Sequence, residues 1–145
     1  MNLPVSPRLF HRDAKITMLR NVPFFSRADR HQLEAVAQAA DLVDVPAGMT
    51  LVTEGQRTNE FCVIAEGTAE VTKGGAAINT LAAGDFFGEI ALVTGRPRTA
   101  TVTATEASTL LVFTGRSFWH VAEAMPSLQA GVLKVLAERL GPQAG

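Results

Sequence analysis

Apolar and polar residues alternate in short runs through the middle of the chain, from Asp41 to Thr114, and glycine interrupts these runs at intervals. Runs of this kind, rich in valine, isoleucine, threonine and leucine, predict β-strands bounded by turns. We expect strands at residues 42–45, 49–53, 60–65, 68–73, 77–81, 99–105 and 108–113. Many short strands without helices between them indicate an antiparallel sandwich or a jelly-roll barrel.

A helical period replaces this alternation on both sides of the β region. We expect helices over residues 14–20, about 27–39, 116–124 and 126–140. Asp13 is placed to cap the first helix, and Ser26 with Asp29 predicts a capping box at the start of the second. The last helix stops at Gly141, which is followed by proline. The predicted order along the chain is therefore helices, barrel, helices.

The fold class that we predict is mainly β with flanking helices: a β jelly-roll barrel with N-terminal helices and two C-terminal helices. A length of 145 residues suits one compact domain. Its expected segments are a flexible N-terminal arm (1–12), an N-terminal helical segment (13–40), the barrel (41–114) and the C-terminal helices (115–141).

Composition and charge exclude several classes of protein. Thirteen basic and fourteen acidic residues give a net charge of −1, so no bulk field attracts nucleic acid or an anionic membrane. Cys62 is the single cysteine, which fits a reducing compartment, and we expect a cytoplasmic protein. The three histidines are far apart in sequence, so we expect no metal site. No nucleophile with a recognisable helper residue is present, and we expect no enzyme.

One stretch, residues 83–102, interrupts the strand pattern and is too long for a hairpin loop. Within it, Glu89–Val93 has the composition of a single helical turn, and Gly88 precedes that turn. Amide groups at the beginning of a helix have no acceptor inside the helix, and glycine lets a ligand approach the backbone, so this point suits an anion. Farther along, Arg98 can add a planar guanidinium and Thr99 a hydroxyl.

A carboxylate in the same stretch restricts the kind of ligand. Glu89 would repel a phosphate unless a hydrogen-bond donor lies between them, and a ribose hydroxyl is such a donor. Taken singly, Glu89 could instead favour the helix dipole, and Arg98 could be a solvated surface charge. Together, amides and an arginine for phosphate and a carboxylate for sugar indicate a nucleotide whose phosphate and ribose lie close to each other.

The run FGEIAL from Phe87 to Leu92, followed by RPRTATV from Arg96 to Val102, resembles the phosphate-binding cassette of cyclic nucleotide-binding domains. We place the cassette at residues 84–102, and the resemblance extends over about residues 18–140. The family includes regulatory subunits of the cyclic-AMP-dependent kinase, cyclic-nucleotide-gated channels and the sensor half of catabolite-activator transcription factors.

The resemblance implies both a site and a ligand. The implied ligand-binding residues are Phe87, Gly88, Glu89, Ile90, Ala91, Arg98, Thr99 and Ala100. The Gly88 region and the Ala91 amide would hold the cyclic phosphate, whose charge Arg98 would balance. Glu89 would hold the ribose 2′-hydroxyl. Cyclic AMP is the preferred ligand and cyclic GMP the alternative, since the Thr99 hydroxyl can contact either the phosphate or the exocyclic amine of a guanine.

The resemblance also implies a sensor or regulatory domain that signals occupancy through movement of its terminal helices. In the last helix, Leu133, Leu136 and Ala137 would cover the base as a lid. The alternative is a sensor or regulatory part of a larger transcription factor, channel, kinase or transferase whose effector domain is absent from this chain. Expected partners are the cyclic nucleotide and, through the terminal helices, a second copy or an effector domain, with no DNA or membrane contact.

Overall fold

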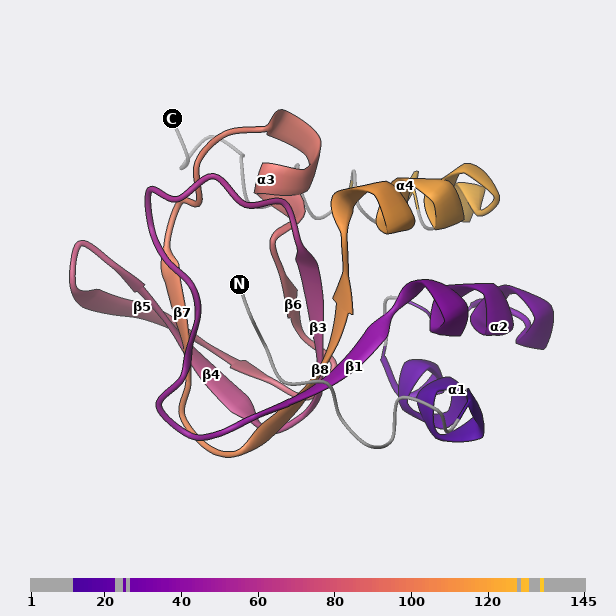
Figure 1. Ribbon diagram of the computed structural model, residues 1–145, viewed down its shortest axis with the longest axis horizontal. Helices are drawn as coiled ribbons and strands as arrows, with labels where there is room; N and C mark the ends of the chain where they lie inside the picture. The colour runs from indigo at the N-terminus through magenta and orange to yellow at the C-terminus, as the bar shows by residue number, and fades with distance from the viewer. Residues whose placement is uncertain (1–11, 23–24, 26, 128, 131–133, 135–145) are drawn as a thin grey trace.

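Two four-stranded antiparallel sheets form the centre of the protein in its computed structural model, which describes residues 12–22, 25, 27–127, 129–130 and 134 (Figure 1). The strands are β1 (Asp41–Val45), β2 (Thr50–Val52), β3 (Phe61–Glu66), β4 (Thr68–Lys73), β5 (Ala76–Ala82), β6 (Phe86–Phe87), β7 (Thr101–Ala104) and β8 (Ser108–Phe113). One sheet has the order β1-β8-β3-β6 and the other β2-β7-β4-β5.

The strand pairing is nested. β1 pairs with β8, β2 with β7, β3 with β6, and β4 with β5. Folding a long hairpin of this kind over on itself produces the two sheets of a jelly roll. The predicted jelly-roll fold is confirmed, and the strand boundaries agree with the predicted ones to within about two residues.

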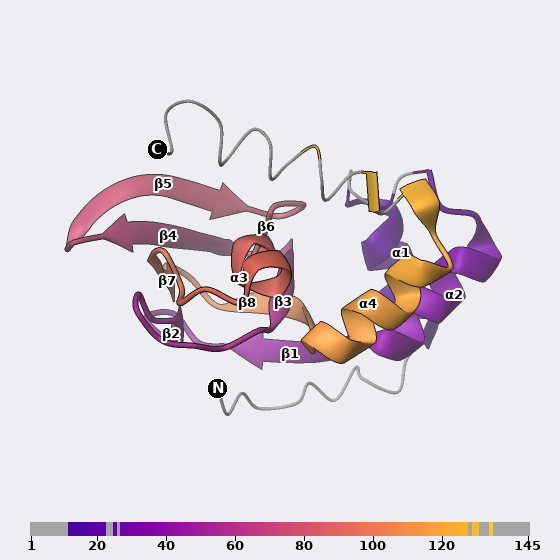
Figure 2. The same ribbon diagram turned by 90° about the horizontal axis from the view of Figure 1, so that it is seen from above.

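Helices α1 (Arg12–Arg20), α2 (Arg30–Ala39) and α4 (Gly115–Glu123) lie at one end of the sandwich, whereas α3 (Glu89–Thr94) lies between β6 and β7 in the sequence (Figure 2). α2 contacts both α1 and α4, and α4 contacts β8. The Lys15 Nζ of α1 donates to the carbonyls of Ala37 and Ala40 at 2.9 and 2.8 Å, which satisfies acceptors at the C-terminal end of α2. None of the helices within the described ranges has the length and apolar character needed to cross a membrane.

The predicted start of the second helix is wrong. α2 begins at Arg30, and its N-cap is Asp29 rather than Ser26. Asp29 Oδ1 accepts from the Gln32 N–H at 2.8 Å, and Gln32 Oε1 accepts from the Asp29 N–H at 3.0 Å. Because Gln32 completes the capping box from within the helix, the first turn starts three positions later than the sequence analysis placed it.

Two other sequence expectations concern the segment before α3 and the helix predicted after α4. The short strand β6 is absent from the prediction, because Phe86 and Phe87 are strand only through their pairing with Val63 and Cys62 of β3. After α4, residues 126, 127, 129, 130 and 134 are helical, which agrees with part of the predicted last helix. The rest of that helix and residues 1–11 of the predicted arm lie outside the described residues.

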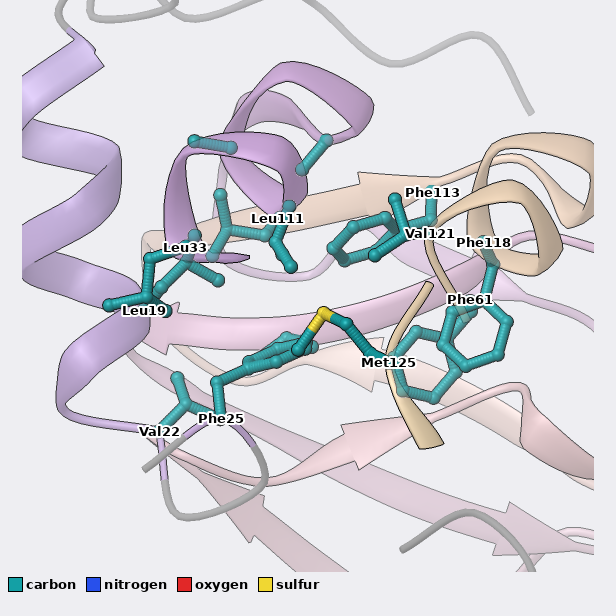
Figure 3. Packing of buried hydrophobic residues seen from close by; sticks show 14 of the residues in the cluster. Leu19, Val22, Phe25, Leu33, Phe61, Leu111, Phe113, Phe118, Val121 and Met125 are labelled. Atoms are coloured by element: carbon teal, nitrogen blue, oxygen red, sulfur yellow. The ribbon is translucent and has the colours of Figure 1, made fainter. Parts of the chain in front are cut away.

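The β1-β8-β3-β6 sheet separates two hydrophobic cores, and β3 contributes to both. Cys62 and Ile64 face the core between the sheets, whereas Phe61 and Val63 face the core beneath the helices. In that second core Phe61 packs against Phe118 of α4 with ring centroids 4.8 Å apart (Figure 3). Burial on both faces makes β3 the strand that joins the sandwich to the helical end.

Candidate functional site

A cavity of about 580 Å³ opens between the predicted cassette and the β2-β7-β4-β5 sheet. This volume lies in the range of about 300–1,000 Å³ that is usual for small-ligand sites. We call it the cassette cavity; its lining residues are Val52, Val71, Ile78, Asn79, Leu81, Phe87, Gly88, Ile90, Ala91, Arg98, Thr99, Ala100 and Val102. All the residues predicted to bind ligand contribute to this lining except Glu89, whose side chain lies outside the described part of the structure. The predicted lid residues also lie outside it.

Gly88 is the N-cap residue of α3, and its backbone packs closely against Glu60 and Arg98. Its φ of +100° lies in the left-handed region that favours glycine. A Cβ atom at this position would lie 2.4 Å from the Glu60 carbonyl oxygen and 2.9 Å from Arg98 Nη1. Glycine is therefore required here by the protein's own packing, before any ligand is considered.

Arg98 is a buried residue, only 5% exposed, rather than a solvated surface charge. Its Nε donates to Thr58 Oγ1 at 2.8 Å, and its Nη2 donates to the Glu60 carbonyl oxygen at 2.9 Å and lies 3.3 Å from Glu60 Oε2. Its backbone is held as well, since the Arg98 N–H donates to the Gln56 carbonyl and the Gly55 N–H donates to the Arg98 carbonyl. The segment that leads into β3 thus fixes the guanidinium in position.

The Nη1 nitrogen of the Arg98 guanidinium is shielded from water, and it has no hydrogen-bond partner among the described residues. An unpaired charged donor in a buried position costs free energy, so such a group requires an explanation in a native structure. The position of Nη1 next to Gly88 supplies one, because the amides at the beginning of α3 also lack acceptors within that helix. Together these donors form an anion-binding end of the cavity.

The rest of the cavity is lined by the strands and is mostly apolar. Val52, Val71, Ile78, Leu81 and Val102 come from β2, β4, β5 and β7. A cavity with donors at one end and apolar side chains along the remainder suits a ligand that joins an anionic group to a flat, weakly polar body.

Cys62 lies beneath the site on β3 and is fully buried. Burial raises the pKa of its thiol to about 12, because a thiolate would lose its hydration; the nearby Arg98 charge acts in the opposite direction and the Glu60 charge in the same one. The thiol is therefore protonated at neutral pH and is a packing group. Within the described ranges, no three histidine, cysteine, aspartate or glutamate residues come together as metal ligands would.

Sequence reasoning missed two parts of the site. Thr58 and Glu60 position Arg98 from about 40 residues away in sequence, and nothing in the local pattern around them indicates this contact. The apolar wall was missed as well, although the alternation of Val71, Ile78 and Leu81 within their strands identifies them as strand residues. Only the folded sheet shows that they face the cassette.

Comparison with known proteins identifies the family of this chain. A family model described as the cyclic nucleotide-binding domain matches residues 42–124. A cAMP-dependent protein kinase regulatory subunit of Schizosaccharomyces pombe is 37% identical over 103 residues, which are 70% of this chain and 25% of that protein. A cyclic nucleotide-gated potassium channel of Rhizobium etli is 32% identical over 120 residues, which are 83% of this chain and 34% of the channel.

Among solved structures, the regulatory domain of Toxoplasma gondii PKA, co-crystallised with cAMP, superposes with a TM-score of 0.79 and 27% identity. The match covers 88% of this chain and 50% of the other. The chain spans about a quarter of the kinase regulatory subunit and a third of the channel.

Proposed function

Because this chain belongs to the cyclic nucleotide-binding domain family, we propose that the cassette cavity binds a cyclic nucleotide and that cyclic AMP is the ligand. The observation that carries this proposal is the Arg98 guanidinium, which is buried, fixed by Thr58 and Glu60, and left with an unpaired Nη1 beside Gly88. A cyclic phosphate is an anion that accepts from such donors. We favour cyclic AMP over cyclic GMP for two reasons. The similar S. pombe protein is a subunit of a cAMP-dependent kinase, and the similar T. gondii domain was co-crystallised with cAMP.

In this proposal the phosphate lies at the anion-binding end and the base extends along the strands. The Ala91 amide and its neighbours at the beginning of α3 donate to the phosphate oxygens, and Thr99, which is exposed at the cavity, adds a hydroxyl. Glu89 holds the ribose 2′-hydroxyl, as the family resemblance implies. Phe87, which belongs to the core between the sheets, and Ile90, which packs against the core beneath the helices, complete the lining on the cassette side.

We expect the domain to bind the nucleotide and release it unchanged. Isothermal titration calorimetry with cyclic AMP should give one site per chain, with weaker binding of cyclic GMP and no detectable binding of linear 5′-AMP, whose phosphate carries a second negative charge and is not tied back to the ribose. Chromatography of the recovered ligand should return intact cyclic AMP. Absence of heat with both cyclic nucleotides would refute the proposed ligand class, and recovery of a linear monophosphate would refute a role in binding alone.

The domain acts in this proposal as a cytoplasmic regulatory module, not an enzyme, as the kinase subunits among its relatives are regulatory. Because the chain spans a small part of those relatives, we propose that it is coupled to an effector, either on a longer chain or through contacts of the terminal helices. A second copy of the domain is the alternative partner at those helices. DNA and membrane contacts are not part of the proposed function.

The terminal helices are expected to report occupancy. The predicted lid of Leu133, Leu136 and Ala137 would cover the base, so ligand would favour the covered state by the difference between its affinities for the two states. Amide hydrogen exchange with and without cyclic AMP should show added protection over residues 86–100 and also over residues 128–140. Added protection confined to residues 86–100 would contradict the proposed movement while leaving ligand binding intact.

A further inference from the structure

The strand side of the cassette cavity contains one polar side chain. Six residues of β2, β4, β5 and β7 form this surface, which we call the strand wall: Val52, Val71, Ile78, Asn79, Leu81 and Val102. Five of these are aliphatic, and among the described lining residues of the wall only Asn79 offers hydrogen-bonding groups on its side chain. If the phosphate occupies the end near Arg98, the base is the part of the ligand that meets this wall.

A β-bulge brings Asn79 and its neighbour to the same cavity. Side chains alternate along a regular strand, so consecutive residues point to opposite faces. In the β4–β5 pair, however, Val71 is opposite Asn79 while Thr72 is opposite Ala77, which leaves Ile78 as an extra residue. Bulges of this kind redirect side chains and are frequent beside functional sites. Both Ile78 and Asn79 consequently line the cavity.

The bulge leaves the large apolar side chain of Ile78 exposed to solvent. It is 57% exposed, the most exposed large hydrophobic residue in the described part of the chain. A regular strand would alternate it away from the cavity that Asn79 and Leu81 line, and the bulge instead holds it at the cavity's edge. An isoleucine held at the edge of a ligand site provides an apolar surface for the face of a flat ring.

The Asn79 amide is held in a definite orientation. Its Oδ1 accepts from the Thr80 N–H at 2.9 Å, which restricts rotation of the amide. Oδ1 keeps a second lone pair, and no acceptor among the described residues takes the Nδ2 hydrogens. The side chain therefore presents one donor and one acceptor beside Ile78.

We propose that Asn79 contacts the edge of the base and makes this site prefer a 6-aminopurine to a 6-oxopurine. The inference rests on the proposed function and adds to it the residue that selects the base. An asparagine amide matches adenine, because Nδ2 donates to N7 while Oδ1 accepts from the 6-amino group. Guanine has two acceptors at those positions, N7 and O6, so Oδ1 would face O6 without a hydrogen between them.

The test is a set of titrations in which variants and ligands are both changed. Wild type, Asn79→Ala and the control Thr80→Ala are titrated with cyclic AMP, cyclic GMP and the cyclic monophosphate of purine riboside, which lacks the 6-amino group. Thr80 is on the same strand, is exposed and does not line the cavity, and its backbone N–H is retained in the control. Asn79→Ala should weaken cyclic AMP about tenfold and the other two ligands at most about threefold. Thr80→Ala should leave all three affinities unchanged.

The outcomes separate this inference from the function on which it rests. Equal losses for all three ligands in Asn79→Ala, or no loss for any of them, would overturn the role of Asn79 while cyclic nucleotide binding by the wild type stands. Failure of the wild type to bind either natural nucleotide would instead refute the proposed function, and the inference with it. Ile78→Ala should weaken the binding of all three ligands equally, because they share the face of the purine ring. A loss confined to cyclic AMP would contradict the proposal that Ile78 contacts the face of the base and Asn79 its edge.

Discussion

Gly88→Ala is expected to abolish measurable cyclic nucleotide binding and to lower the free energy of unfolding by about 2–4 kcal/mol. The backbone conformation at φ +100° accounts for about 1–2 kcal/mol of this loss for an L-residue. The added Cβ would also overlap the Glu60 carbonyl oxygen, at 2.4 Å, and press on Arg98 Nη1. Relief requires the beginning of α3 or the guanidinium to move, and these are the donors of the anion-binding end. Calorimetry and urea denaturation measure the two effects.

Gly95→Ala is the matched control for this substitution. Gly95 is the C-cap of the same short helix and also has a positive φ, +67°, but a Cβ there would meet no atom within 4 Å. The control carries the backbone strain without the overlap, so it should cost about 1 kcal/mol of stability and keep its affinity for the nucleotide. Equal losses of affinity in both variants would show that strain alone, and not the contact with Glu60 and Arg98, explains the effect.

Arg98→Ala is expected to weaken cyclic AMP binding by one to two orders of magnitude. Hydrogen bonds to a charged group contribute about 1.5–3 kcal/mol, and Arg98 supplies the one side-chain cation that lines the described part of the cavity. Stability should also fall, by about 1–2 kcal/mol, because Thr58 and the Glu60 carbonyl lose their donors. Titration calorimetry and thermal unfolding of the ligand-free protein give the two quantities separately.

Two further variants test whether position or charge matters at Arg98. Arg98→Lys keeps the charge, but one ammonium cannot reproduce the planar contacts to both Thr58 and Glu60, so affinity should still fall about tenfold. Arg96→Ala removes an exposed arginine two residues away and should change affinity by less than about twofold. Equal losses in Arg96→Ala and Arg98→Ala would mean that a general positive field, rather than the fixed guanidinium, attracts the ligand.

Much of the fold was predictable because its signals are local. Glycine turns and alternating apolar residues predict most strands of the jelly roll, and these positions are strands in the structure. β6 was not predictable in this way, since Phe86 and Phe87 become a strand only when they meet β3. The start of α2 was misplaced because Ser26 and Asp29 imitate a capping box, whereas Asp29 and Gln32 form the real one.

The site residues also differ in whether the local sequence could identify them. Gly88 and Arg98 belong to one continuous run, so the family resemblance identifies them. The family itself is confirmed by the match over residues 42–124. Thr58, Glu60 and Asn79 come from other strands and loops, and they reach the cassette only through long-range pairing. The individual roles of the cassette residues stay predictions until the variants are measured.

The two-sided burial of β3 has a thermodynamic consequence for any effector. Glu60, which contacts Arg98, directly precedes Phe61, and Phe61 packs on Phe118 of α4. An anion that contacts Arg98 and a partner that contacts α4 would therefore both act on neighbouring residues at the start of β3. Linkage requires their effects to be reciprocal: by whatever factor the nucleotide strengthens or weakens the partner's binding, the partner changes the nucleotide's affinity by the same factor. Measured affinity for cyclic AMP would then depend on how much effector is present.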